Sequence, residues 1–321
     1  MINRNILFYK IHKSGFTGRV IDTLRNLYQK TTYRIKSNNK ISEPTSETSG
    51  VNQGGTASPF LFRIYLSDLK DCLDEYTGIC LSDEILIHVL WADDLYLVSN
   101  DTAGSQKQLK GLTAFCGPNQ MAANVIKTKV MVYGKSSPVH LLLYGNPIEP
   151  VNAIQMLRGD IFKNNPEYLI NRARGAIFGI LRRVKNIGNV MPKYMFYLYE
   201  SIVEPILLYG SDVWGVKTSS TKSIDNLLLW YIRLVLRMKS NTCNIITMGE
   251  SGMLPPSIKA HQRAMLYFVR MNQMPDGSIL KNMFNDIKNL HLSGFKNWYS
   301  DMLDLAKSYS IDITSLQFFK S

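Results

Sequence analysis

Two adjacent carboxylates, Asp93 and Asp94, lie between two apolar, β-branched arms within residues 85–98. Each arm is long enough for a strand and too short for a stable buried helix, so the pattern predicts a β-hairpin with the acids at or beside its turn. Asp is one of the few side chains that tolerates the left-handed backbone such a turn requires. Two ionised acids on an apolar hairpin are costly without a cation, because desolvation disfavours the charged form. A divalent metal ion is the obvious partner, although a merely polar turn is the commoner explanation of such a pair.

A glycine-rich polar loop, residues 49–57, runs into Ser58 and Pro59. Serine is a typical N-cap and proline suits the first helical position, so the sequence predicts a helix over residues 60–73. Such a loop directs backbone N–H groups and the positive end of the helix dipole towards an anion. A tight connection into a helix with no ligand is an equally common explanation.

The elements that must position these residues change in kind along the chain. Periodicity predicts helices over residues 3–13, 17–29 and 103–116, a hairpin over 31–45 and a strand over 125–133. In that strand Lys127 and Lys129 project to one side. From about residue 166 the pattern is helical alone. We expect an α+β region over residues 1–160 and an all-α region over 161–321.

Composition restricts the class of protein. The 321 residues, 45% hydrophobic and 19% charged, describe a folded globular chain that can hold two cores. No apolar run is long enough to span a membrane, and no secretory signal is present, so we expect an intracellular protein of the nucleus or cytoplasm with no membrane partner. The four cysteines lack the spacing of a zinc site.

Positive charge is concentrated at the two sides of an acidic middle. Residues 1–40 carry nine Lys and Arg against one acid, and residues 161–240 carry twelve against five. On a helical wheel of residues 170–185, the apolar face is opposed by a basic face made of Arg172, Arg174, Arg182, Arg183 and Lys185. A later helical stretch carries Arg233 and Arg237 one turn apart. Such faces bind a phosphate backbone, although amphipathic helices often carry Lys and Arg simply on their solvated side.

Taken in this order, the motifs are similar to those in the palm of a reverse transcriptase encoded by non-LTR (LINE-type) retrotransposons. Ser49–Gly54 resembles the glutamine–glycine loop of that family, and Trp91–Asp94 resembles its aromatic-Ala-Asp-Asp box. Asn124–Lys129 matches its Asn-x-x-Lys-Thr-Lys signature, and residues 206–215 look like its downstream helical region. The resemblance covers roughly residues 3–270. It implies a partial polymerase palm followed by a helical, thumb-like domain.

The resemblance also implies a chemistry and its partners. It implies RNA-directed DNA polymerisation by two-metal nucleotidyl transfer, with Mg²⁺ or Mn²⁺, a dNTP, an RNA template and a DNA primer. Asp93 would be the principal metal ligand, with Asp94 assisting, and Lys127 would lie near phosphate charge. The loop residues implied to contact the nucleotide or template are Gly50, Gln53 and Gly54. The basic helices would hold the template–primer duplex, and the oligomeric state is left open.

The sequence departs from this family at one critical point. The third palm carboxylate normally lies on a strand just before the segment that matches Asn3–Lys10, and this chain starts at Met1. We therefore expect an N-terminally truncated reverse transcriptase that is inactive as this isolated chain. The alternative is a non-catalytic nucleic-acid-binding remnant that uses its basic helices. A decaying reading frame without a selected function is a third possibility.

Overall fold

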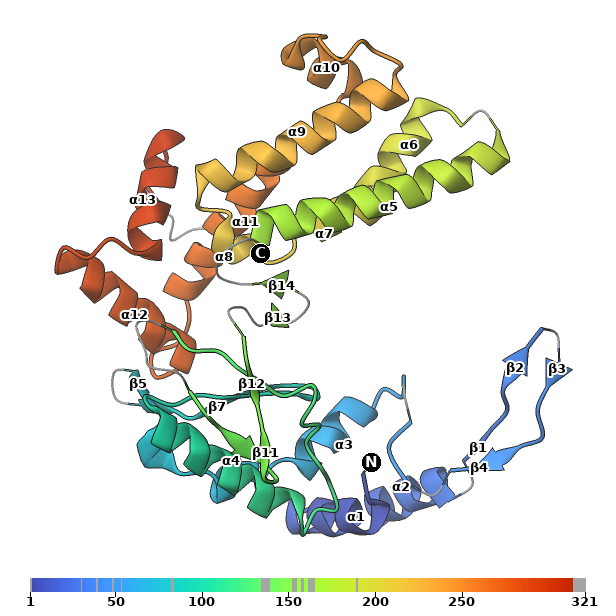
Figure 1. The fold of residues 1–321 in the computed structure, drawn as a ribbon, viewed down its shortest axis with the longest axis vertical. Coiled ribbons are helices and arrows are strands. Elements are labelled where there is room, and N and C mark those ends of the chain that lie inside the picture. Colours follow the sequence, from blue (N-terminus) through green and yellow to red (C-terminus); the bar gives the residue numbers. More distant parts are fainter. Residues whose placement is uncertain are drawn as a thin grey trace. The chain divides into compact units, whose positions relative to one another are not determined.

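The computed structural model describes the chain except residues 1, 30, 39, 48, 53, 82–83, 134–138, 152–154, 157–158, 161–164, 189 and 314–321. The side chains of residues 155–156, 159–160, 165–166 and 218–220 are not described either. The chain divides into two compact units, Met1–Asn152 and Ala153–Ser321 (Figure 1). No described helix is long and apolar enough to cross a membrane.

The helices of the first unit begin in different ways, and not all of them have a polar cap. They are α1 (Arg4–Lys13), α2 (Arg19–Gln29), α3 (Ser58–Tyr65) and α4 (Thr102–Cys116). The Asn3 side chain accepts the first free N–H groups of α1, and the Asp101 carboxylate accepts the Gly104 N–H of α4 at 2.6 Å. The helix predicted over residues 60–73 is shorter than expected, because α3 ends at Tyr65. A 3₁₀ turn, Leu69–Cys72, follows, and it buries Leu69.

The strands of the first unit form short pairs, and each described sheet has two strands. The antiparallel pairs are β1 (Thr32–Tyr33) with β4 (Thr45–Ser46), β2 (Lys36–Ser37) with β3 (Lys40–Ile41), β5 (Ile79–Leu81) with β6 (Glu84–Leu86), β7 (His88–Trp91) with β8 (Asp94–Leu97), and β10 (Leu142–Leu143) with β11 (Asn146–Pro147). One pair, β9 (Lys129–Val130) with β12 (Glu149–Pro150), is parallel. The strand predicted over 125–133 is therefore mostly wrong: residues 125–127 form a turn, because the Asn124 carbonyl accepts the Thr128 N–H at 2.9 Å.

The core of the first unit gathers between α1, α3 and α4. Its largest fully buried side chains include Leu7, Ile11 and Tyr65. Leu90, Leu95 and Leu97 of the β7–β8 hairpin pack against this core and are partly buried. The hairpin thus owes its place to one apolar face. A smaller cluster lies between α4 and the β10–β11 pair.

The second unit is almost wholly helical. Its elements are the short pair β13 (Gln155–Met156) and β14 (Gly159–Asp160), then α5 (Asn165–Ile187), α6 (Pro192–Leu198), a π-helical turn (Tyr199–Val203), α7 (Glu204–Leu207), α8 (Ser211–Trp214), α9 (Thr218–Val235), α10 (Asn244–Ser251), α11 (Pro256–Asn272), α12 (Ile279–Leu292) and α13 (Trp298–Ser308). Helices α5 and α9 run alongside each other in Figure 1. Together the two units give the mixed α+β content that the sequence predicts.

Two clusters form the core of the helical unit. The first lies between α5, α9 and the π-helical turn, where the rings of Tyr199 and Tyr231 lie 5.0 Å apart. The second joins α11, α12 and α13 around Phe268 and Phe284. Close approach of α8 and α11 requires Gly215, because a Cβ there would lie 2.6 Å from the Ala260 carbonyl oxygen.

Candidate functional site

The predicted hairpin is confirmed, with the two carboxylates at its tip. Trp91 pairs with Asp94, so Ala92 and Asp93 form a two-residue turn. Ala92, rather than an aspartate, adopts the left-handed backbone, with φ of 51°. A non-glycine residue in this region costs on the order of 1–2 kcal/mol. The turn is therefore strained at the residue immediately before Asp93.

The two faces of the β7–β8 hairpin differ in burial. The pairs Leu90–Leu95 and His88–Leu97 share the face that packs on the core. The opposite face carries Asp94 beside Trp91, which is 63% exposed. Both Asp93 and Asp94 are exposed. The hairpin therefore holds its acids in solvent at the end of a ribbon that is anchored along one face.

The surroundings of the two acids bear on whether a metal ion could bind there. Among the described residues, no group of three or more His, Cys, Asp or Glu side chains is placed to hold a metal ion. His88 lies on the packed face of β7, where burial lowers the pKa of its imidazole. Its Nδ1 is buried and has no hydrogen-bond partner among the described residues. The donor set at the tip therefore consists of two carboxylates with oxygen atoms open to solvent.

The glycine-rich loop is anchored by a residue distant in sequence. The Arg4 guanidinium, at the first turn of α1, donates to the carbonyls of Gly50 at 3.0 Å and Glu47 at 2.5 Å. It also donates to the Tyr28 carbonyl at 2.8 Å and forms an ion pair with the Glu47 carboxylate at 3.1 Å. Its side chain is only 10% exposed. Arg4 thus ties together α1, the end of α2 and the start of the loop.

A second set of hydrogen bonds connects the loop to Tyr33 of β1 and to α3. The Tyr33 hydroxyl lies 2.7 Å from the Glu47 carboxylate and 3.1 Å from the Asn52 amide oxygen. The Ser58 hydroxyl donates to the Asn52 carbonyl at 2.6 Å. The N-cap of α3 is Ala57, so Ser58 lies inside the helix and closes the loop instead of capping it as the sequence suggested.

The predicted loop residues are only partly described. Gly50 and Gly54 adopt φ of 85° and 82°, a backbone that side-chain-bearing residues rarely take. Gly54 is exposed, and a Cβ added to it would meet no atom within 4 Å. Gln53, which the sequence placed against a nucleotide or template, lies outside the described residues.

Lys127 lies in a turn rather than on a strand. Its backbone N–H donates to the Asn124 amide oxygen at 3.2 Å, and its side chain is exposed. Lys129, two residues on, is in β9 and its ammonium is paired with Glu149. Lys127 and Lys129 therefore do not form a joint cationic row, because the second lysine is already neutralised.

The basic residues of α5 are all exposed, but they do not share one face of the helix. At 100° per residue, Arg174 and Lys185 fall on one flank, and Arg182 lies opposite the buried side. Arg172 and Arg183 fall on the other flank. The single basic face expected from the sequence is thus a broad solvated surface around α5.

Arg233 and Arg237 have different structural positions. The Arg233 guanidinium donates to the Thr242 carbonyl at 2.7 Å and to the Asn244 amide oxygen at 2.5 Å. It therefore braces the connection between α9 and α10. Arg237 lies beyond the end of α9, with φ of 55°, and is exposed. The two arginines do not form one row on a helix.

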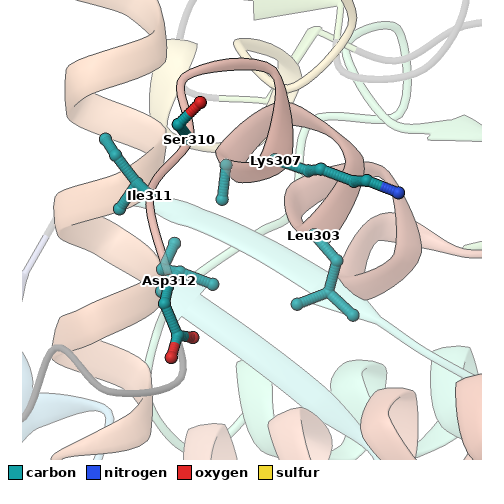
Figure 2. Close-up of a pocket in the computed structure, with 7 residues that line it drawn as sticks. Leu303, Lys307, Ser310, Ile311 and Asp312 are labelled. Atoms are coloured by element: carbon teal, nitrogen blue, oxygen red, sulfur yellow. The ribbon is translucent and has the colours of Figure 1, made fainter.

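Sequence reasoning missed the anchoring role of Arg4, Glu47 and Tyr33. A weak signal was available, since a cation in the first turn of a helix opposes the helix dipole and needs a partner elsewhere. A shallow pocket at the end of α13 contains none of the predicted residues. In Figure 2 the charged ends of its Lys307 and Asp312 do not converge.

Comparisons with known proteins connect the first unit to one family. Residues 1–154 match the family model for reverse transcriptase (RNA-dependent DNA polymerase). The chain is 24% identical over 241 residues, 71% of its length, to a retrovirus-related Pol polyprotein from the type-1 retrotransposable element R2 of Popillia japonica. It is 30% identical over 139 residues, 40% of its length, to a putative uncharacterized transposon-derived protein of Caenorhabditis elegans. It spans 38% and 49% of the lengths of these two relatives.

Proposed function

We propose that this chain, whose residues 1–154 have a reverse transcriptase sequence of the non-LTR retrotransposon kind, supplies part of an RNA-directed DNA polymerase. In this proposal the first unit contributes part of the palm, and the helical unit acts as a thumb-like domain over residues 161–321. The observation that carries the proposal is the exposed Asp93–Asp94 pair at the tip of a hairpin held by one packed face.

The carboxylates at the hairpin tip suit a hard divalent cation. Asp93 and Asp94 would supply oxygen ligands to Mg²⁺ or Mn²⁺, which prefer such ligands and retain several waters. When bound, a pair of such ions offsets the negative charge on the attacking and leaving oxygens of phosphoryl transfer. The two-residue turn exposes both carboxylates to solvent, and the packed face of the hairpin fixes their position.

The glycine-rich loop is the proposed contact for a nucleotide or for the template. Gly50, Gln53 and Gly54 would contribute backbone that can approach the ligand closely. Support comes from the Arg4 and Ser58 hydrogen bonds, which hold the two ends of the loop. Lys127, which is exposed and forms no ion pair with another described residue, would lie near phosphate charge.

A polypeptide of residues 1–321 alone is proposed not to polymerise DNA. Two adjacent carboxylates from one turn leave a pair of divalent ions with few protein ligands, and no third acid joins them among the described residues. In the part of the chain that the structure describes, β7 and β8 pair only with each other, so the hairpin has edges to which a strand carrying another carboxylate could be added.

Primer extension tests this proposal. Residues 1–321 should fail to extend oligo(dT) on poly(rA) in Mg²⁺ or Mn²⁺. Extension that the Asp93→Asn variant abolishes would refute the inactivity of this polypeptide and assign catalysis to the hairpin. A control polymerase in the same reaction shows that the template and primer are competent.

A non-catalytic nucleic-acid-binding protein is the second candidate. It is favoured by the exposed arginines on both flanks of α5. It predicts binding to a primer–template that weakens steeply with salt, because contacts with phosphate groups release counterions. It also predicts the same affinity in Asp93→Asn, because the acids make no contact with phosphate. An affinity that hardly changes between low and moderate salt would refute it.

A further inference from the structure

The helical unit contains a pocket between α5 and α9 that the proposed catalytic chemistry does not use. It encloses about 500 Å³ and is lined by Arg174, Phe178, Ser223, Asn226, Leu227 and Trp230. Helices α5 and α9 pack directly on each other through the unit's main core, so the lining residues project from rigid elements. The backbone beneath the pocket is therefore held in place by the core.

Two aromatic rings form one wall of this pocket. The ring centroids of Phe178 and Trp230 lie 6.0 Å apart at 65°, an edge-to-face arrangement. Phe178 is 59% exposed and Trp230 is 38% exposed, whereas Leu227 is 4% exposed and forms the floor. In an edge-to-face pair, one ring uses its edge and keeps its faces free for a planar ligand.

The polar groups around the rings are uncommitted. Arg174 is exposed and makes no ion pair with any residue that the structure describes. Ser223 and Asn226 are exposed, and their side chains make no hydrogen bond with another described residue. No acid lines the pocket, and Lys185 lies farther along the same flank of α5. A ligand here meets a stacking surface, an amide, a hydroxyl and positive charge.

We propose that this pocket binds an unstacked base of a single-stranded nucleic acid. The aromatic rings would stack on the base, Ser223 and Asn226 would reach its polar edge, and Arg174 would contact the adjoining phosphate. Bases inside a duplex are stacked on both sides, so only a single strand offers a free face. The proposal rests on nucleic-acid binding by the helical unit, and RNA and DNA share the chemistry that it requires.

Fluorescence anisotropy with labelled oligonucleotides of about 12 nucleotides tests the pocket. The probes are oligo(U), oligo(dT) and an abasic strand of equal length and charge. Phe178→Ala should weaken binding of the base-containing strands about 5-fold or more and leave the abasic strand unchanged. Phe178 is mostly exposed, so its removal leaves the core intact. The matched control is Tyr197→Ala, which removes a 66% exposed aromatic residue on α6 and should change neither affinity.

A second variant separates stacking from folding. Trp230→Phe retains an aromatic ring and should retain affinity, while Trp230→Ala should lose it as Phe178→Ala does. Comparison of oligo(U) with oligo(dT) then decides whether RNA or DNA is preferred.

Four results would overturn the proposal that this pocket binds a base. Equal weakening of abasic and base-containing strands would show that Phe178 does not stack on bases. Unchanged affinity in Phe178→Ala, with salt-dependent binding by the wild type, would refute the pocket and leave nucleic-acid binding standing. Self-association of the wild type that Phe178→Ala abolishes, with oligonucleotide affinity unchanged, would assign the pocket to a protein segment. Absence of any binding by the wild type would refute the pocket together with nucleic-acid binding.

Discussion

Replacement of Arg4 should destabilise the first unit and release the glycine-rich loop. The guanidinium donates to three carbonyls in two segments: that of Tyr28 near the end of α2, and those of Glu47 and Gly50 around the start of the loop. It also pairs with the Glu47 carboxylate. Arg4→Ala removes all these donors at once, and a buried acceptor without a donor bears its full desolvation cost.

The expected loss of stability in Arg4→Ala depends on how deeply the Arg4–Glu47 ion pair is buried. Loss of one partner of a buried ion pair costs about 3–5 kcal/mol, but the Glu47 side chain is 33% exposed, so water replaces part of the interaction. We expect Arg4→Ala to cost about 2–4 kcal/mol, a large fraction of the 5–15 kcal/mol that stabilises a typical protein. Arg4→Lys keeps the charge but lacks the fork of donors, so it should recover about half of that loss. Glu47→Gln should cost about 1 kcal/mol, because it weakens only the partly exposed ion pair and the carbonyl contacts of Arg4 remain.

Hydrogen exchange in residues 2–57, with urea unfolding in parallel, measures both effects. The backbone N–H of Gly50, which donates to the Ile2 carbonyl at 2.7 Å, should exchange faster in Arg4→Ala. The matched control is Arg34→Ala, which removes an exposed arginine between β1 and β2 and should leave the free energy of unfolding unchanged. A cost below about 1 kcal/mol for Arg4→Ala, with Gly50 exchange unchanged, would refute the anchoring role.

Three further outcomes follow from backbone strain, close packing and buried histidines. Ala92→Val should destabilise by about 1–2 kcal/mol while Ala92→Gly stays near neutral in urea titrations, because a β-branched residue resists φ of 51°; equal effects would contradict the strain. Gly215→Ala should cost about 1–3 kcal/mol by thermal unfolding, since its Cβ would clash with the Ala260 carbonyl; a neutral result would refute the close approach. Burial lowers the pKa of His88 and of His261, so the unfolded chain binds protons first as the pH falls below about 6.5. The free energy of unfolding should thus be highest above that pH and decrease below it. Urea midpoints measured between about pH 8 and pH 5 test this. The decrease should be smaller in His261→Gln.

Local pattern was sufficient for several features. The apolar arms around Asp93 and Asp94 predicted the hairpin, because alternation and length are properties of the segment itself. The order of motifs predicted the reverse transcriptase relationship, and the loss of strand pattern after residue 166 predicted a helical second half. The assigned roles of the site residues stay predictions.

Tertiary contacts decided what local pattern could not. Ala92 takes the left-handed position because the register of β7 and β8 places Asp94 opposite Trp91, and register depends on which face packs on the core. Lys127 lies in a turn because Asn124 bonds to the backbone after it, which outweighs a strand-like alternation.

The sequence by itself determined where the acids, the glycine loop and the basic helices lie along the chain, because strand and helix periodicity depend on residues that are close in sequence. Only the tertiary structure decided that Arg4 is committed to a loop 46 residues away and that Arg233 braces the α9–α10 connection. It alone brought Phe178 and Trp230 into one pocket. These outcomes depend on hydrogen bonds and packing between segments far apart in the chain, which no local pattern encodes.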